Sequence, residues 1–226
     1  VILLLLGLPA QTMADLYGFV SDDFSAGSLD TTVWTALDPL GDGTVGVNGS
    51  GQLELTVPGG VNHDVWTAGN DAVRVMQAVN DTGFELEIKF ESAVSERYQL
   101  QGMVVEQDAG NFIRFDFFSD TSSTRVFAAS FAGGSPTQRV NTVISSGAPL
   151  YMRVKREGDQ WTQSFSVDGV VWNPAGSFSY PLVVTSVGAF AGNAGGGGAP
   201  AHTAVIDYFF STASPISPED GVAIPD

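Results

Sequence analysis

The chain of 226 residues contains no cysteine, only two histidines and only nine lysine and arginine residues. Without cysteine it can form no disulfide, no thiolate zinc site and no cysteine nucleophile. The nine basic residues are set against 25 aspartates and glutamates, which gives a formal net charge of -16. Such a surface repels a phosphate backbone and an anionic bilayer, so we predict that nucleic acid is not a partner.

A long apolar run is also missing, because the run from Val1 to Leu8 is too short to cross a bilayer. We therefore predict no membrane insertion. The run is followed by a Gly-x-Pro break, and Thr12 and Ala14 occupy the -3 and -1 places of a cleavage site. This pattern predicts a signal peptide over residues 1–14, although its positively charged start is absent, and hence a secreted, extracellular protein.

The other end of the chain has the composition of a linker. Residues 214–226 contain three of the eleven prolines together with Ser, Asp and Glu, and they show no apolar period. Such a segment is typical of an extended linker, so we expect covalently attached further domains. The compact domain is predicted over residues 15–213, a length that suits one β-sandwich.

No segment of this domain has a convincing helical pattern, whereas short β-like segments separated by turn residues recur throughout. Nine strands are predicted, over residues 51–57, 72–79, 84–92, 98–107, 111–118, 124–131, 150–157, 161–168 and 203–210. Gly and Asp in the connections favour tight hairpins, as at Asp168-Gly169, after which a further strand that carries Trp172 is expected. These features predict an all-β domain of two antiparallel sheets, connected as a meander of hairpins.

Two of the predicted strands show which side faces the core. Over residues 84–91 the apolar and charged side chains alternate strictly, which predicts one buried face and one solvated face. Over residues 111–118 both faces carry aromatic residues, and one of them combines Phe112, Arg114, Asp116 and Phe118. A face that mixes rings and charges is typical of a sheet that binds sugars.

Four stretches together resemble a known family: SDDFSAGSLDTTVW at 21–34, residues 98–118, residues 150–172 and AVIDYFF at 204–210. They are similar to the concanavalin A-like, laminin G-like jelly-roll modules, especially those attached to β-xylosidases, and to secreted domains of unknown function. The most specific features are Asp168-Gly169-x-x-Trp172 and the opening Asp22-Asp23-Phe24 with the closing Asp207-Tyr208-Phe209. The resemblance implies a jelly-roll β-sandwich in one domain. Because that superfamily includes lectins, binding modules, glucanases and lyases, the fold does not decide the function.

Catalytic carboxylates have little support in the sequence. Jelly-roll glucanases carry two glutamates that flank an aspartate on one strand, and the nearest match here is Glu85-x-Glu87 with Glu91. It lacks the central aspartate and places Lys89 on the same face, so a solvated charged surface is favoured. Glu106 and Asp116 lie on adjacent predicted strands, where Asp116 is expected to pair with Arg114.

The histidines do not form a recognisable site either. His63 and His202 lie far apart in the sequence without companion ligands, so zinc is not expected. The stretch VNHDVW could bring His63, Asp64 and Trp66 to the rim of a loop. No Gly-x-Ser-x-Gly elbow supports a serine nucleophile.

Calcium is a different case, because it takes carboxylate and carbonyl oxygens. In the modules that this sequence resembles, a structural Ca²⁺ often joins the opening strand to the closing strand. The resemblance implies Asp22, Asp23 and Asp207 as its ligands. The alternative is that these residues are ordinary turn and edge acids.

We interpret the sequence as a noncatalytic carbohydrate-binding module of a secreted multidomain protein, with a polysaccharide or glycan as its partner. The alternative is a glycoside hydrolase or polysaccharide lyase on the same fold, and an adhesion or matrix role is a third possibility. The glycine-rich loop at 192–200 lacks the helix and lysine of a phosphate loop and is expected to border the site. The predicted ligand-binding residues are Trp66, Arg74, Gln77, Gln99, Gln101, Arg114 and Asp116.

Overall fold

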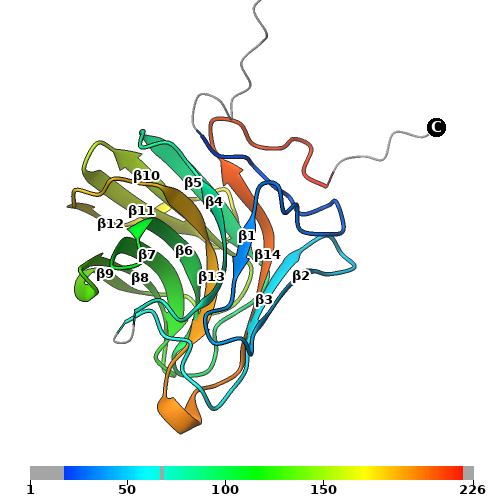
Figure 1. Ribbon diagram of the computed structural model, residues 1–226, viewed down its shortest axis with the longest axis vertical. Helices are drawn as coiled ribbons and strands as arrows, with labels where there is room; N and C mark the ends of the chain where they lie inside the picture. Colours follow the sequence, from blue (N-terminus) through cyan, green and yellow to red (C-terminus); the bar gives the residue numbers. More distant parts are fainter. Residues whose placement is uncertain (1–17, 67–68, 221–226) are drawn as a thin grey trace, which may run out of the picture.

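The computed structural model describes residues 18–66 and 69–220, so the predicted signal peptide and residues 221–226 lie outside the described part of the chain. The described chain forms two antiparallel sheets of seven strands each, which confirms the predicted all-β sandwich (Figure 1). Its helical content is one short 3-10 turn, Gly196–Gly198. Among these residues no helix is long and apolar enough to cross a membrane.

The two sheets are called the front sheet and the back sheet. The front sheet has the strand order β1-β4-β13-β6-β7-β8-β9, with bounds Thr35–Leu37, Val73–Ala78, Ser186–Asn193, Gln99–Asp108, Asn111–Ser119, Thr124–Ala132 and Ser135–Ile144. The back sheet has the order β12-β11-β10-β5-β14-β3-β2, with bounds Asn173–Ser179, Gln160–Ser166, Leu150–Glu157, Phe84–Phe90, His202–Ser211, Leu53–Val57 and Thr44–Val47.

The main hydrophobic core lies between the two sheets. The alternation predicted for β5 is confirmed, because its four apolar side chains are buried and Glu85, Glu87 and Lys89 are partly exposed on the other face. Trp161 of β11 is fully buried and packs edge to face against Phe84, with ring centroids 6.0 Å apart. Burial of so many rings on one face of each sheet is the main force that holds the sheets together.

All nine strands predicted by residue range are present, and the further strand expected after the Asp168-Gly169 turn is β12. Four strands were missed: β1, β2, β9 and β13. Strands β1 and β2 have only three and four residues, and β9 is an edge strand with largely exposed side chains. Strand β13, with the sequence SVGAFAGN, is rich in small residues yet almost fully buried. A Cβ on Gly188 would lie 1.9 Å from the carbonyl oxygen of Val75, so this strand needs glycine to fit beside β4.

The prediction of a plain meander of hairpins is wrong for the centre of each sheet. Strands β6 to β9 and β10 to β12 do follow one another as meanders. However, β13 is inserted between β4 and β6, and β5 lies between β10 and β14. Long-range pairing of this kind buries the central strands on both sides and cannot be read from local turn residues.

The opening and closing segments of the domain meet, as the sequence predicts. Asp22 and Phe209 exchange two backbone hydrogen bonds, of 2.9 and 2.8 Å. Beyond β14 the chain stays close to the domain, because the Ser21 hydroxyl donates to the carbonyl of Ser214 at 2.7 Å. The predicted linker therefore begins along the sandwich surface, and its boundary at residue 213 stays a prediction.

Candidate functional site

The outer face of the front sheet, turned away from the main core, carries a second apolar cluster. Its members are Val65, Ala72, Met76, Leu100, Val104, Phe112, Phe127, Ala129, Phe131 and Phe190. The connection between β3 and β4 lies over part of this face and brings Trp66 to it, with ring centroids 6.1 Å from both Phe127 and Phe131. The predicted mixed face of β7 is therefore confirmed in position, although a loop covers part of it.

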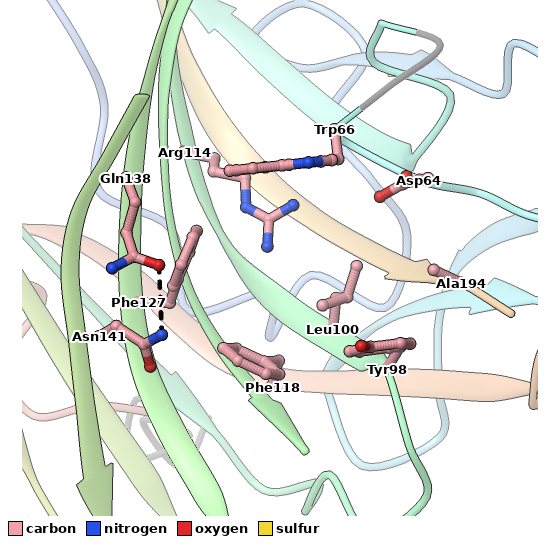
Figure 2. Close-up of a pocket in the computed structure, with 10 residues that line it drawn as sticks. All are labelled: Asp64, Trp66, Tyr98, Leu100, Arg114, Phe118, Phe127, Gln138, Asn141 and Ala194. Carbon is pink, nitrogen blue, oxygen red and sulfur yellow. Dashed lines mark hydrogen bonds between the residues drawn. The ribbon is translucent and has the colours of Figure 1, made fainter. Parts of the chain in front are cut away.

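Where this cover ends, the outer face forms a pocket of about 370 Å³, within the usual range of about 300 to 1,000 Å³ for ligand sites. Figure 2 shows the residues around it. It is lined by Asp64, Trp66, Tyr98, Leu100, Arg114, Phe118, Phe127, Gln138, Asn141 and Ala194. The lining combines four aromatic rings, two amides and two charged groups.

Arg114 projects from β7 into the pocket, and its charge is already paired. Its Nε and Nη2 donate to the two carboxylate oxygens of Asp116, at 2.8 and 3.3 Å, and its Nη1 donates to the carbonyl of Val65 at 2.8 Å. Arg114 is 5% exposed and Asp116 is fully buried, so the predicted ion pair is confirmed and Asp116 lies behind the arginine. Burial raises the pKa of Asp116 to about 6, although Arg114 opposes the rise.

Two aromatic side chains face each other across this space. Figure 2 shows Trp66 on one side of the pocket, Tyr98 on the opposite side, and the Arg114 guanidinium directed between them. Tyr98 has a φ of 64°, an unusual backbone conformation for a bulky residue. Its N–H donates to the carbonyl of Ser119 at 2.7 Å, and its own carbonyl accepts from Ala194 at 3.1 Å. The neighbouring strands thus hold Tyr98 in a conformation that it would not adopt alone.

The other wall of the pocket comes from β9, which the sequence analysis missed. Gln138 pairs with Ala129 and Asn141 pairs with Phe127, and the register shifts between these pairs. The shift places one extra residue on β9, a β-bulge, so two side chains three positions apart reach the same face. The Asn141 amide donates to the Gln138 side-chain oxygen at 3.3 Å. The polar sequence SPTQRVNTVI has no alternation that could have revealed this wall.

Two of the predicted ligand-binding residues, Gln99 and Gln101, lie on the wrong face. Both are buried and directed between the sheets. Gln99 accepts from the backbone of Ser95 at 2.8 Å, and Gln101 donates to the carbonyl of Ser92 at 2.8 Å. They fix the connection between β5 and β6, so the expected cluster with Arg114 is not formed by these residues.

Gln77 and Arg74 on β4 are also separate from the pocket. Gln77 is buried and holds the backbone of Val20 through two hydrogen bonds, of 2.7 and 3.0 Å. Arg74 lies on the outer face, where its Nε is 3.5 Å from the Glu106 carboxylate. Of the seven predicted residues, Trp66 and Arg114 line the pocket, and Asp116 supports Arg114.

The VNHDVW stretch divides between the pocket and the interior. Asp64 and Trp66 line the pocket, as expected of a loop rim. His63 is instead fully buried, where its Nε2 lies 2.8 Å from Asp42 and its backbone pairs with Asn193. The glycine-rich loop borders the site through Ala194, as the sequence analysis expected.

The three aspartates predicted to bind calcium do not form a ligand set that fits the ion. Asp22 accepts from the indole of Trp34 at 2.8 Å, and Asp23 accepts from Ser25. Asp207 is bonded to the ammonium of Lys89, a cation that competes with Ca²⁺ for the same oxygen. Within residues 18–66 and 69–220 no group of three or more His, Asp or Glu side chains is arranged to hold a metal ion.

The glutamates weighed as catalytic residues lie on the outer face of the back sheet, away from the pocket. Glu87 pairs with Arg153 at 2.7 Å and accepts the Tyr208 hydroxyl at 2.6 Å. Glu91 pairs with Lys89 at 2.7 Å. These pairs form a charged network on the surface of the sheet, in agreement with the preferred interpretation of their spacing.

No protein-family model matches the chain, and no curated protein matches its sequence. Solved structures do resemble it. The Bacteroides ovatus xyloglucan PUL GH43B is 16% identical with a TM-score of 0.68, over 85% of this chain and 39% of that chain. The GH43 protein BlXynB from Bacillus licheniformis is 18% identical with a TM-score of 0.66, over 86% of this chain and 39% of that chain.

The CBM2 module of the evolved Dit of Lactobacillus casei BL23 phage J-1 is similar over nearly its whole length. It is 8% identical with a TM-score of 0.56, over 84% of this chain and 93% of the module. The chain thus spans about two fifths of the two GH43 proteins, 39% of each. At these identities the likeness establishes a shared β-sandwich fold.

Proposed function

We propose that this protein is a noncatalytic carbohydrate-binding module of the concanavalin A-like type, carried by a secreted multidomain protein, and that its site is the pocket on the front sheet. The observation that carries the proposal is the lining itself. Sugars present apolar CH faces and hydroxyl edges together, so their sites combine rings to stack on with planar hydrogen-bonding groups. Trp66 and Tyr98 supply the rings, and Arg114, Gln138 and Asn141 supply the planar groups.

The similar structures support this proposal at the level of the fold. Two of them are GH43 proteins, and this chain matches 39% of the length of each. A module of that relative size is consistent with attachment to further domains, as the linker composition predicts. The name of the Bacteroides ovatus protein includes xyloglucan, which makes that polysaccharide the first ligand to test.

A glycoside hydrolase or lyase is the second candidate, and the pocket favours it less. Hydrolysis of a glycosidic bond uses two carboxyl groups that flank the scissile bond. Among the residues lining the pocket Asp64 is the carboxylate, while the fully buried Asp116 is bonded to Arg114 through both oxygens. Asp116 is therefore poorly placed to reach a substrate, and a binding role requires no second carboxylate.

Binding to polysaccharides tests the proposal directly. We expect retardation of the wild-type protein in native gels that contain at least one of xyloglucan, arabinoxylan, galactan or laminarin, with no release of reducing ends. Trp66→Ala should strongly reduce the retardation, because truncation of an aromatic anchor in a binding site typically costs about 2 kcal/mol or more. Trp172→Ala is the matched control, because Trp172 immediately precedes β12, does not line the pocket, and has its ring centroid 3.8 Å from the guanidinium of Arg153 on the back sheet. Release of reducing ends would instead support the enzyme.

A further inference from the structure

We infer that two arginines outside the pocket lining, Arg97 and Arg125, are positioning residues that hold Tyr98 and Asn141 in the orientation in which they bind a glycan. This inference rests on the proposed function, because it concerns the same site. It is carried by the contacts that the two guanidinium groups make with side chains of the pocket.

Arg97 lies against the ring of Tyr98. Its guanidinium carbon is 4.6 Å from the ring centroid, which is within the range of a cation–π contact, and its Nη2 donates to the Tyr98 hydroxyl at 3.0 Å. Tyr98 lines the pocket, whereas Arg97 does not. Arg97 therefore supports the ring from outside and leaves the pocket side of Tyr98 to a ligand.

The positive charge of Arg97 is not paired with a carboxylate. The chain has 25 acidic residues for nine basic ones, and seven of the basic side chains form ion pairs. Among residues 18–66 and 69–220 the two exceptions are Arg97 and Arg139, and both lie over aromatic rings. Tyr98 is thus the principal partner of an exposed arginine in a chain where acids are abundant.

Tyr98 is therefore held at its hydroxyl as well as at its backbone, where its φ is 64°. Its phenol oxygen accepts from Arg97, so its O–H stays free to donate to a ligand oxygen. A hydrogen bond accepted from a cation polarises the hydroxyl and strengthens it as a donor. A side chain that is already fixed also loses less conformational entropy when a ligand binds.

Arg125 holds the amide wall of the pocket in a similar way. Its Nε is bonded to the Asp120 carboxylate, and its Nη1 donates to Oδ1 of Asn141 at 3.0 Å. This contact fixes the orientation of the amide, so Nδ2 of Asn141 donates to Gln138, at 3.3 Å. Figure 2 shows the two amides together on one side of the pocket. Asn141 can therefore offer a ligand its second N–H as a donor.

The experiment begins with removal of each arginine. Arg97 is exposed and the Arg125 side chain is 28% exposed, so we expect both alanine variants to fold. Each should bind the polysaccharide retained in gels about threefold or more weakly by calorimetry, because one hydrogen bond no longer orients the site. Arg153→Ala is the matched control, because it also removes a guanidinium from an aromatic ring, but on the back sheet. Equal losses in all three variants would overturn the inference.

Double-mutant cycles separate positioning from direct contact with the glycan. If Arg97 acts through Tyr98, its removal should leave the affinity of Tyr98→Gly almost unchanged. Removal of Arg125 should likewise have little effect on the affinity of Asn141→Ala. Full additivity in both cycles would overturn the inference and leave the binding function standing, because the arginines would then contact the glycan themselves.

A measurement without glycan keeps the inference separate from the proposed function. In NMR spectra of protein labelled at its tyrosine rings, Arg97→Ala should shift the Tyr98 signal, which is assigned by its absence from Tyr98→Gly. The signal of Tyr208 on the back sheet should stay in place. An unshifted Tyr98 signal would overturn the role of Arg97 whether or not a glycan binds. A shifted signal with failure of every glycan to bind would overturn the proposed function, and with it the purpose assigned to the two arginines.

Discussion

Gln138 and Asn141 lie three residues apart on β9, yet both side chains line the same pocket. In a regular strand such residues would point to opposite faces, and the bulge opposite Ala128 and Ala129 brings them together. If the pocket binds a sugar, Gln138→Ala and Asn141→Ala should each weaken binding by about 0.5 to 1.5 kcal/mol, the usual value of one hydrogen bond. Calorimetry with the polysaccharide retained in gels provides the measurement. Thr142→Ala on the same strand should leave the affinity unchanged, and equal losses in all three variants would contradict a role in the pocket.

Substitution of Tyr98 should affect the affinity for the sugar much more than the stability of the protein. Its φ of 64° costs on the order of 1 to 3 kcal/mol, which a glycine at this position would relieve. We expect Tyr98→Gly to change the free energy of unfolding by less than about 1 kcal/mol, since lost ring contacts offset the relief, while the affinity for the sugar falls about tenfold.

The control for Tyr98 is Thr121→Gly. Thr121 also has a positive φ, of 84°, but it does not line the pocket. The control variant should bind the sugar as tightly as the wild type. Unchanged binding in Tyr98→Gly would show that the tyrosine is not part of the site.

Because Arg114 is paired with the buried Asp116, its substitution should lower stability as well as affinity. From the sequence alone, Arg114→Ala is expected to weaken binding with the fold intact. In the structure the substitution leaves the fully buried Asp116 without its partner, so unfolding by urea at pH 8 should show a loss of about 3 to 5 kcal/mol.

A surface ion pair supplies the comparison. Arg125 and Asp120 form a similar contact, but their side chains are 28% and 23% exposed, so Arg125→Ala should cost no more than about 1 kcal/mol. Equal losses in the two variants would contradict the view that burial determines the cost.

His202 should make the protein less stable in acid. It is buried beside Gln101, and burial lowers the pKa of His202 from 6.5 to about 4. Between these values the unfolded chain binds more protons than the folded chain, so stability falls as the pH falls from 6.5 to 4, by on the order of 3 kcal/mol. Asp116, whose pKa is raised to about 6, acts in the opposite direction below pH 6.

The contribution of His202 to the pH dependence of stability can be isolated by comparing the wild type with a variant that lacks this histidine. His202→Gln removes this titration and leaves Asp116 unchanged. The free energy of unfolding, measured by urea denaturation between pH 4 and pH 7, should therefore rise less steeply with pH in the variant than in the wild type. Parallel curves would show that the pKa of His202 is the same in the folded and unfolded chains, which would contradict its lowering by burial.

A structural calcium ion between the chain ends stays a prediction of the sequence, and the structure argues against it. Because the Lys89 ammonium is bonded to Asp207, we expect a chelator to leave the melting temperature unchanged. Asp207→Asn, measured with and without added Ca²⁺, completes the test. If chelation lowers the melting temperature of the wild type but not that of Asp207→Asn, the calcium site would be supported.

The sequence by itself determined the fold class and one strand of the site. The predictions of strict alternation over Phe84–Phe90 and of a mixed face over Phe112 to Phe118 were correct. Local spacing is sufficient here, because alternate residues of a strand share one face. Trp66, expected at the rim of a loop, does line the pocket, and its role in ligand binding stays a prediction. The chain ends meet at Asp22 and Phe209, as the resemblance to jelly-roll modules implied.

Only the tertiary structure decided which face of β6 belongs to the site and where β9 and β13 lie. Strand β6 is buried on both faces, so its pattern could not show that Leu100 reaches the pocket while Gln99 and Gln101 point inward. The bulge in β9 depends on its pairing with β8, and the burial of the predicted Arg114–Asp116 pair depends on a distant loop whose Val65 carbonyl accepts from Arg114. Register and burial arise from contacts between residues far apart in the chain, which local sequence patterns do not encode.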